Sequence, residues 1–190
     1  MDNKLIIAKK RKRFDTIRST HTLLSQCPRL PFDDECFKFV SHGDFSCASF
    51  IALVAKYTVI NTLYASTFSM GKKECLLFDN LADDGRLNDV HIVVSSQIFN
   101  GNNHSTTRTI KGFCDKFDWK IVAKKNHSKI LLFDTDDGQF VLETSSNLNA
   151  NSKTEFYSFE KDLLLYQFYL KEIFDTGDGI DFVKYGVGDG

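Results

Sequence analysis

The chain has 190 residues, a formal net charge of −1, an apolar fraction of 42% and a charged fraction of 26%, values that are ordinary for one globular domain with a sizeable core. The near-zero charge excludes a protein that coats polyanions over its whole surface, so an attraction to nucleic acid must come from local patches. No apolar run approaches the roughly 20 residues that span a bilayer, and the basic N-terminus has no adjoining apolar region, so we expect neither a membrane span nor a secretory signal.

Residues 1–31 are expected to form a basic N-terminal arm, because five consecutive cations run from Lys9 to Arg13. Two interpretations of these cations remain open: a phosphate-binding arm that steers DNA toward the site, or a solvated and partly mobile tail. Pro28 and Pro31 interrupt the segment, which predicts that the compact domain begins near residue 32.

Strand and helix patterns alternate from residue 37 to residue 123. Branched and aromatic residues predict strands, and one-sided apolar spacing predicts helices. The expected strands cover residues 37–40, 57–67, 90–96 and 119–123, and the expected helices cover residues 47–56, 69–82 and a segment that ends near residue 117. This alternation implies an α/β fold with a mostly parallel sheet and helices on both faces.

Four cations are candidate substrate contacts. Arg108 follows the expected 90–96 strand, at the end where open α/β sheets bind their ligands. Lys124 and Lys125 come shortly before an apolar run at residues 130–133, and Lys153 precedes a later strand. These side chains would hold a polyanionic backbone; the alternatives are a solvated helix face for Arg108 and a basic loop for the paired lysines.

The central segment of the chain is a short apolar run at residues 130–133, which is typical of a buried strand and ends at an Asp/Gly-rich turn. Side chains alternate along a strand, so His127 and Lys129 are expected to point the same way. An imidazole beside an ammonium suits an anion that must also be attacked.

Two more extended segments follow this run. The first covers residues 139–144 and ends in Ser145-Ser146-Asn147, so a hydroxyl at 145 and an amide at 147 share one side of the backbone. The second covers residues 153–159 and carries one acid, Glu155, among aromatic residues. An amphipathic helix is then expected over residues 162–174, before a Gly/Asp-rich tail at 177–190 that we expect to be ordered only by docking onto a partner.

The pattern His127-x-Lys129-x₄-Asp134, followed by Ser145-x-Asn147 and Glu155, resembles the HKD signature of the phospholipase D superfamily, in its single-motif bacterial and phage nuclease-like branch. The resemblance is sharp over residues 120–175 and extends only in fold pattern over 37–119. It implies a phospholipase D-like domain over 32–176, with a mixed, mostly parallel sheet, helices on both faces and one HKD motif. Thr144 stands where the family has glycine. This departure bears on the backbone geometry of the turn that leads to Ser145.

The resemblance also implies the roles of these residues. His127 would attack phosphorus to form a phosphohistidine, and Glu155 would orient its imidazole. The non-bridging oxygens would be bound by Lys129, Ser145 and Asn147. Asp134 has the opposite parity from His127, so we expect it to have a structural role at the strand end although it is part of the signature.

One HKD motif supplies one histidine, whereas this chemistry needs a second as general acid. The other histidines lack a lysine two residues on: His21, His42, His91 and His104. We therefore expect a homodimer that brings His127 of each copy to one site on the two-fold axis. No metal and no other cofactor are expected, because Lys129 and the amide donors supply the electrostatics.

The expected function is that of a metal-independent phosphodiesterase, a nuclease that cleaves DNA in preference to RNA. One alternative is a nucleic-acid-binding protein whose HKD site is degenerate, and another is a lipid phosphodiesterase or transferase. The cysteines lack a CxxC spacing, and their odd number predicts reduced thiols and a cytoplasmic protein. They are Cys27, Cys36, Cys47, Cys75 and Cys114.

Overall fold

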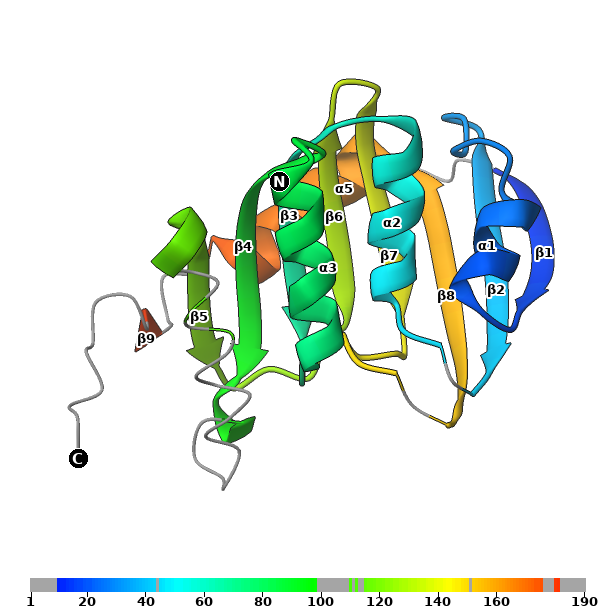
Figure 1. The fold of residues 1–190 in the computed structure, drawn as a ribbon. Helices are drawn as coiled ribbons and strands as arrows, with labels where there is room; N and C mark the ends of the chain where they lie inside the picture. The colour runs from blue at the N-terminus through cyan, green and yellow to red at the C-terminus, as the bar shows by residue number, and fades with distance from the viewer. Residues whose placement is uncertain are drawn as a thin grey trace, which may run out of the picture.

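The computed structural model describes residues 10–43, 45–98, 110, 112, 115–150, 152–175 and 180–181. Within them one nine-stranded sheet has the order β1-β2-β8-β7-β6-β3-β4-β5-β9 (Figure 1). The strands are β1 Arg11–Ile17, β2 Glu35–His42, β3 Ile60–Thr67, β4 Leu87–Ser95, β5 Lys120–Lys124, β6 Ile130–Thr135, β7 Gly138–Thr144, β8 Thr154–Lys161 and β9 Ile180–Asp181. The helices are α1 Thr20–Gln26, α2 Ala48–Tyr57, α3 Lys72–Asp83, the 3₁₀ turn η1 Ser96–Ile98, α5 Leu163–Tyr169 and the π-helical turn η2 Leu170–Phe174.

The sheet is mixed. Of the nine strands in the described part of the chain, β1 to β5 and β7 run one way, and β6, β8 and β9 run against them. The expectation of a mostly parallel sheet therefore holds for strand directions. It does not hold for the pairings, of which three are parallel and five antiparallel, because β6, β7 and β8 follow one another as a meander. Gly138, with a φ of 115°, allows the tight turn between β6 and β7.

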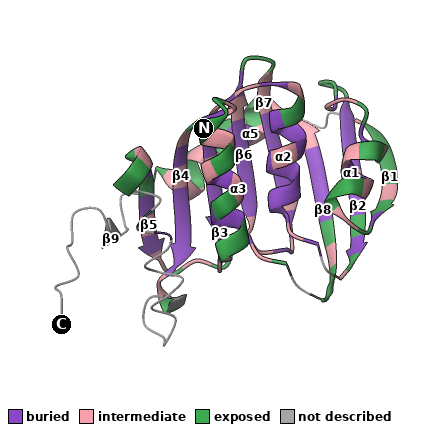
Figure 2. Cartoon of the chain, in the orientation of Figure 1, coloured by how far each residue is buried: buried purple, intermediate pink, exposed green. Residues whose placement is uncertain are grey.

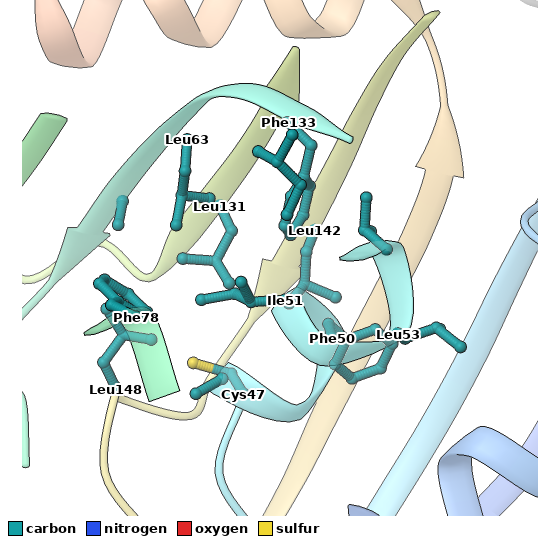
Figure 3. Close-up of a cluster of buried hydrophobic side chains, with 14 of the residues drawn as sticks. Cys47, Phe50, Ile51, Leu53, Leu63, Phe78, Leu131, Phe133, Leu142 and Leu148 are labelled. Atoms are coloured by element: carbon teal, nitrogen blue, oxygen red, sulfur yellow. The ribbon is translucent and has the colours of Figure 1, made fainter. Parts of the chain in front are cut away.

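Helices cover both faces of the sheet: α1, α2 and α3 lie in front of it in Figure 1 and α5 lies behind. The strand β6 shows why two layers form, because its apolar residues alternate between two cores. Leu131 and Phe133 pack into the large core under α2 and α3 (Figure 3). Ile130 and Leu132 pack into the smaller core with Tyr166 of α5. The buried residues accordingly concentrate along the central strands and α2 (Figure 2).

The large core is rich in aromatic contacts. The ring of Phe50, fully buried on α2, lies 5.7 Å from that of Phe39, 5.3 Å from that of Tyr157 and 5.5 Å from that of Phe159. Such pairs add to the free energy of area burial. They join α2 to β2 and β8, two strands that are distant in the chain and pair antiparallel.

The N-terminal segment corrects the expectation of an arm that precedes the domain. From residue 10 it belongs to the sheet: β1 pairs parallel to β2, and α1 begins at the N-cap Ser19, whose Oγ accepts a hydrogen bond from Thr22 N. Ile17 and Leu23 are fully buried and anchor the two elements. The strand was missed because its other side chains are polar or exposed, which an edge strand tolerates.

Three of the cations in the run are engaged in ion pairs rather than held free for DNA. Lys10 pairs with Glu160 and Asp162, and Arg11 pairs with Asp34. Arg13 lies 3.5 Å from a carboxylate oxygen of Asp15. These contacts favour a structural role for the described part of the basic segment.

The remaining segments broadly follow the expected pattern. The helix expected at 162–174 is present as α5 and η2, and the side chain of Asp162 caps it through Leu165 N at 3.0 Å. In the expected tail, Ile180 and Asp181 pair antiparallel with β5 of the same chain. Among the described residues, no helix is both long and apolar enough to cross a bilayer.

Candidate active site

The candidate site lies at one edge of the sheet, where β3, β4 and β7 end and β6 and β8 begin. Residues 125–129 cross this edge from β5 to β6. Asn126 clamps the crossing: its Nδ2 donates to Ser66 Oγ and Thr67 O, both at 3.1 Å. Its Oδ1 accepts from the backbone N of Ser128 at 3.1 Å and from its Oγ at 2.7 Å. The clamp fixes the backbone on either side of His127.

The two motif side chains meet as their shared parity predicted. Lys129 Nζ lies 3.1 Å from Nδ1 of His127 and 2.6 Å from its carbonyl oxygen. The imidazole is exposed and packs beside the ring of Phe68, with centroids 5.5 Å apart. Strand β6 begins at Ile130, so the expectation that His127 and Lys129 lie at the start of this strand is wrong. Both residues precede the strand, in the crossing whose backbone is bonded to Asn126.

The electrostatic environment of Lys129 is mixed. Burial lowers the pKa of its ammonium below the usual range, and the charge of Glu155 acts in the opposite direction and raises it. The cation is thus partly stripped of water beside an exposed imidazole. This combination favours an anion at the same place, since an anion restores the solvation that the ammonium has lost.

Ser145 and Glu155 are bonded to each other across β7 and β8. The Oγ of Ser145 donates to Glu155 Oε2 and accepts from Phe156 N at 3.1 Å. The hydroxyl therefore already has a carboxylate partner, and it must turn from Glu155 to donate to a phosphate oxygen. Glu155 is placed within electrostatic reach of Lys129.

Thr144 keeps the turn in place without the family's glycine. Its φ is not positive, so no conformation reserved for glycine is required. Its Oγ1 donates to Phe156 O at 2.7 Å and accepts from Ser146 N at 2.9 Å. The threonine thereby ties the end of β7 to β8 directly behind Ser145.

Asn147 is connected to the histidine through Phe68. Its Oδ1 accepts from Phe68 N at 3.2 Å, and the Phe68 ring packs against His127. The backbone oxygen of Asn147 accepts from Cys47 Sγ at 3.2 Å. The structure therefore places Asn147 behind the ring that supports His127.

Asp134 is not brought to this edge. It lies one residue before the end of β6, whereas His127 precedes the start of that strand. It accepts a hydrogen bond from Gln139 Nε2 at 2.9 Å. On the α5 face it adds to the effect of burial in raising the pKa of Tyr64 and Tyr166. The structural role that its parity suggested stays a prediction.

The candidate substrate cations have different surroundings. Lys124 donates to the carbonyl oxygen of Ile173 in η2, which ties it to the α5 side of the sheet. Lys125 and Lys153 are both exposed, one in the crossing loop and the other just before β8. Arg108 lies outside the described residues.

An open pocket of about 520 Å³ adjoins the histidine. Its walls include His127, Lys129 and Ser145, and also Lys38 of β2, whose Nζ donates to Ser158 Oγ at 2.5 Å. Sequence reasoning missed Lys38 because only the pairing of β2 with β8 brings it there. It also missed Asn126, for which adjacency to His127 was the available signal.

No family model matches the chain, and no curated protein matches it. Among the solved structures that resemble it, two share 15% sequence identity with it. The phosphatidylserine synthase of Haemophilus influenzae Rd KW20 gives a TM-score of 0.56 over 77% of this chain and 39% of that one. The polyphosphate kinase of Porphyromonas gingivalis gives 0.57 over 85% of this chain and 26% of that one.

At this level of identity the likeness shows the fold alone, and that fold is phospholipase D-like: one mixed sheet with helices on both faces. The expected fold class is confirmed. This chain spans well under half the length of either neighbour.

Proposed function

We propose that the protein is a phosphodiesterase that cleaves nucleic acid, with DNA favoured over RNA, through a phosphohistidine at His127 and without a metal ion. The observation that carries the proposal is the 3.1 Å approach of Lys129 Nζ to His127 Nδ1 on an exposed edge that also holds the Ser145–Glu155 pair. An ammonium, a hydroxyl and an imidazole then converge where a phosphate can enter.

In the first step an imidazole nitrogen of His127 attacks phosphorus. The P–N bond forms as the P–O bond to the leaving oxygen breaks, and that oxygen takes a proton from a general acid. A phosphate oxygen is a stronger acceptor for Lys129 than Nδ1, because the bond to it is charge-assisted. Binding thus draws the ammonium from the imidazole to the substrate and frees the ring for attack.

Ser145 also responds to the negative charge of the bound phosphate. When its hydroxyl turns from Glu155 to a phosphate oxygen, the carboxylate becomes available to accept a hydrogen bond from an imidazole N–H, which fixes the tautomer of His127. Donors arranged in advance around the developing charge supply the stabilisation. In the second step water attacks phosphorus, the P–N bond breaks and His127 is restored.

The general acid is supplied by His127 of a second copy, because a single imidazole cannot act as nucleophile and as acid in the same step. The two copies share one site on a two-fold axis. In the second step the partner's imidazole takes the proton from water. The support for this arrangement is the exposed position of His127 at the sheet edge.

The test is cleavage in excess EDTA. Supercoiled plasmid, single-stranded DNA, RNA and phosphatidylcholine vesicles are incubated with the protein and with the His127→Ala variant. His21→Ala serves as a matched control, because His21 is an exposed histidine on α1. We expect cleavage of DNA by the protein and the control and its loss in His127→Ala.

Three other outcomes would contradict the proposal. Cleavage that persists in His127→Ala would remove this residue from the chemistry. Binding of DNA without cleavage would indicate a degenerate site that only binds. Release of a lipid headgroup in place of DNA cleavage would assign the site to lipid phosphodiesters.

A further inference from the structure

The exposed charges of the described residues are separated between the two ends of the strands. We call the end that holds His127 the histidine edge, which is the lower edge in Figure 1, toward which the arrowheads of β2, β4 and β5 point. The other end is called the opposite edge. The formal net charge of −1 conceals this separation, because cations at one edge cancel acids at the other.

Exposed cations stand beside strand ends along the histidine edge. Arg18 directly follows β1, Lys125 directly follows β5, and Lys153 directly precedes β8. Two more exposed cations, Lys72 and Lys73, begin α3. We call these five residues the basic row. Within the part of the chain that the structure describes, no ion pair involves four of them: Arg18, Lys72, Lys73 and Lys125.

The start of α3 is fixed at this edge by the loop that follows β7. Gly71 N donates to Leu148 O at 2.7 Å, and Asn149 Nδ2 donates to Ser69 Oγ at 3.1 Å. The same segment begins at Phe68, whose ring packs against His127. The two lysines of α3 therefore belong to the surroundings of the histidine, although neither is part of the motif.

The acids near the histidine edge do not offset the basic row. Glu155 and Glu143 each accept a hydrogen bond from a hydroxyl group, and Glu74 is buried. Of the exposed acids in the described ranges, none directly flanks a strand end at this edge; Asp44 lies outside those ranges. On the α5 face, η2 carries exposed residues of both signs: Lys171, Glu172 and Asp175.

The opposite edge has the reverse charge. Two of its exposed cations are held in ion pairs, Arg11 with Asp34 and Lys116 with Asp79. Exposed aspartates lie before β2, after α3, before β5 and between β6 and β7. They are Asp33, Asp34, Asp83, Asp84, Asp118, Asp136 and Asp137. A field of this form repels a polyanion from the opposite edge and attracts it to the histidine edge.

The length of the basic row matches one turn of a DNA duplex. The strand order from β1 to β5 is β1-β2-β8-β7-β6-β3-β4-β5, so at about 4.8 Å per interval Arg18 and Lys125 are separated by about 34 Å. One turn of B-DNA is also about 34 Å long. His127 precedes β6, about 19 Å from the β1 end of the row by the same spacing, and therefore lies near its middle.

We propose that the histidine edge binds one turn of double-stranded DNA, with the axis of the duplex across the strand ends and its phosphates on the basic row. The proposal rests on the proposed function for the role of His127. It adds to that function the form of the nucleic acid and two groups of contacts that flank the histidine. These are Arg18 on one side, and Lys72 with Lys73 on the other.

A duplex fits the row better than a single strand does. Phosphate contacts are enough to hold a duplex, whereas proteins that bind single strands stack successive bases on aromatic rings. Exposed rings do not follow the row in the described part of the chain: Phe156 lines the pocket beside His127, and the others lie within β1, before β2 and on α5. The half-buried ring of Phe68 is already packed against the imidazole.

The experiment measures the salt dependence of binding to a labelled duplex of about one turn, or about 10 base pairs, by fluorescence anisotropy in EDTA. Every protein carries His127→Ala, so that binding is measured without turnover. Six phosphate contacts, from the basic row and Lys129, predict that the logarithm of affinity falls with the logarithm of salt concentration with a slope of about −5. Affinity should then fall about 10³-fold between about 50 and 200 mM salt.

Variants on the two sides of His127 test the row. Lys72→Ala with Lys73→Ala should reduce the slope by about 1.8 and the affinity at about 100 mM salt by about 60-fold. Arg18→Ala should reduce the slope by about 0.9 and the affinity by about 8-fold, and both differences should vanish toward about 1 M salt. Circular dichroism confirms that each variant is folded.

The matched control removes the same charge from the opposite edge. Lys56 and Lys120 are exposed lysines in the last turn of α2 and at the start of β5. Because screening at about 0.1 M salt limits charge effects to about 10 Å, replacing both by alanine should change affinity less than about twofold. Equal losses in the control and in the Lys72 and Lys73 variant would show an effect of net charge and overturn the proposal.

The other outcomes separate this surface from the proposed function. Loss of affinity on one side of His127 alone, or tighter binding of a single strand than of the duplex, would overturn the proposal. Binding with the predicted slopes, without EDTA-resistant cleavage by the protein that retains His127, would support this surface and overturn the proposed function. Cleavage that needs His127 but is unchanged in both row variants would overturn this surface and leave the proposed function standing.

Discussion

The clamp at Asn126 gives the sharpest prediction about how the fold holds its reactive histidine. Asn126→Ala removes two donor contacts at 3.1 Å, to Ser66 and Thr67, and two acceptor contacts with Ser128. At about 1 kcal/mol net for each hydrogen bond, and with partial replacement by water, the free energy of unfolding should fall by about 2–3 kcal/mol. The neighbouring His127 then loses its fixed position.

The catalytic effect should exceed the effect on binding. A displacement of about 1 Å in a reacting group can lower the rate about 100-fold, so kcat for DNA cleavage in EDTA should fall by roughly that factor while KM changes little. Urea unfolding and steady-state kinetics measure the two effects. Asn61→Ala is the control, because Asn61 makes an exposed bond to Asp136 and its loss should cost less than about 0.5 kcal/mol. Wild-type kcat in the Asn126 variant would refute the reasoning.

Three further predictions concern the core, the pH dependence and the motif aspartate. Phe50→Ala removes the centre of the aromatic cluster and should cost about 3–5 kcal/mol in urea unfolding, whereas a cost below about 1 kcal/mol would contradict the packing. Arg29 lowers the pKa of Glu35 from 4.5 to about 2, so the stabilisation is present above pH 4.5 and is lost as pH falls toward 2. Glu35→Gln should flatten the fall in stability over this window, and an unchanged slope would contradict it. Asp134→Asn should lower stability by about 1 kcal/mol and leave kcat nearly unchanged, whereas Lys129→Ala should lower kcat about 100-fold or more; equal losses in both variants would contradict the structural role of Asp134.

Local patterns predicted how two side chains of the candidate site lie relative to each other. The apolar run of β6 and the alternation of side chains predicted the common direction of His127 and Lys129, and the contact between them agrees with it. The same rule separated Asp134 from the site. Both inferences used only the spacing of neighbouring residues, although His127 and Lys129 lie before β6 and not within it.

Other features depend on pairings that distant residues decide. Lys38 reaches the pocket only because β2 pairs with β8, and the balance of parallel and antiparallel pairs follows from the β6–β8 meander. The strand β1 was missed because one buried residue, Ile17, is too weak an apolar signal. The clamp by Asn126 depends on where β3 and β4 end, which no local pattern encodes.

The most direct test of the account is to find the covalent intermediate. The protein is mixed with an excess of DNA substrate in EDTA, quenched in base within the first turnover, digested and examined by mass spectrometry. The account predicts the substrate's phosphoryl group on the peptide that contains His127, and no such adduct in His127→Ala. DNA cleavage without an adduct, or with the adduct on another residue, would contradict it.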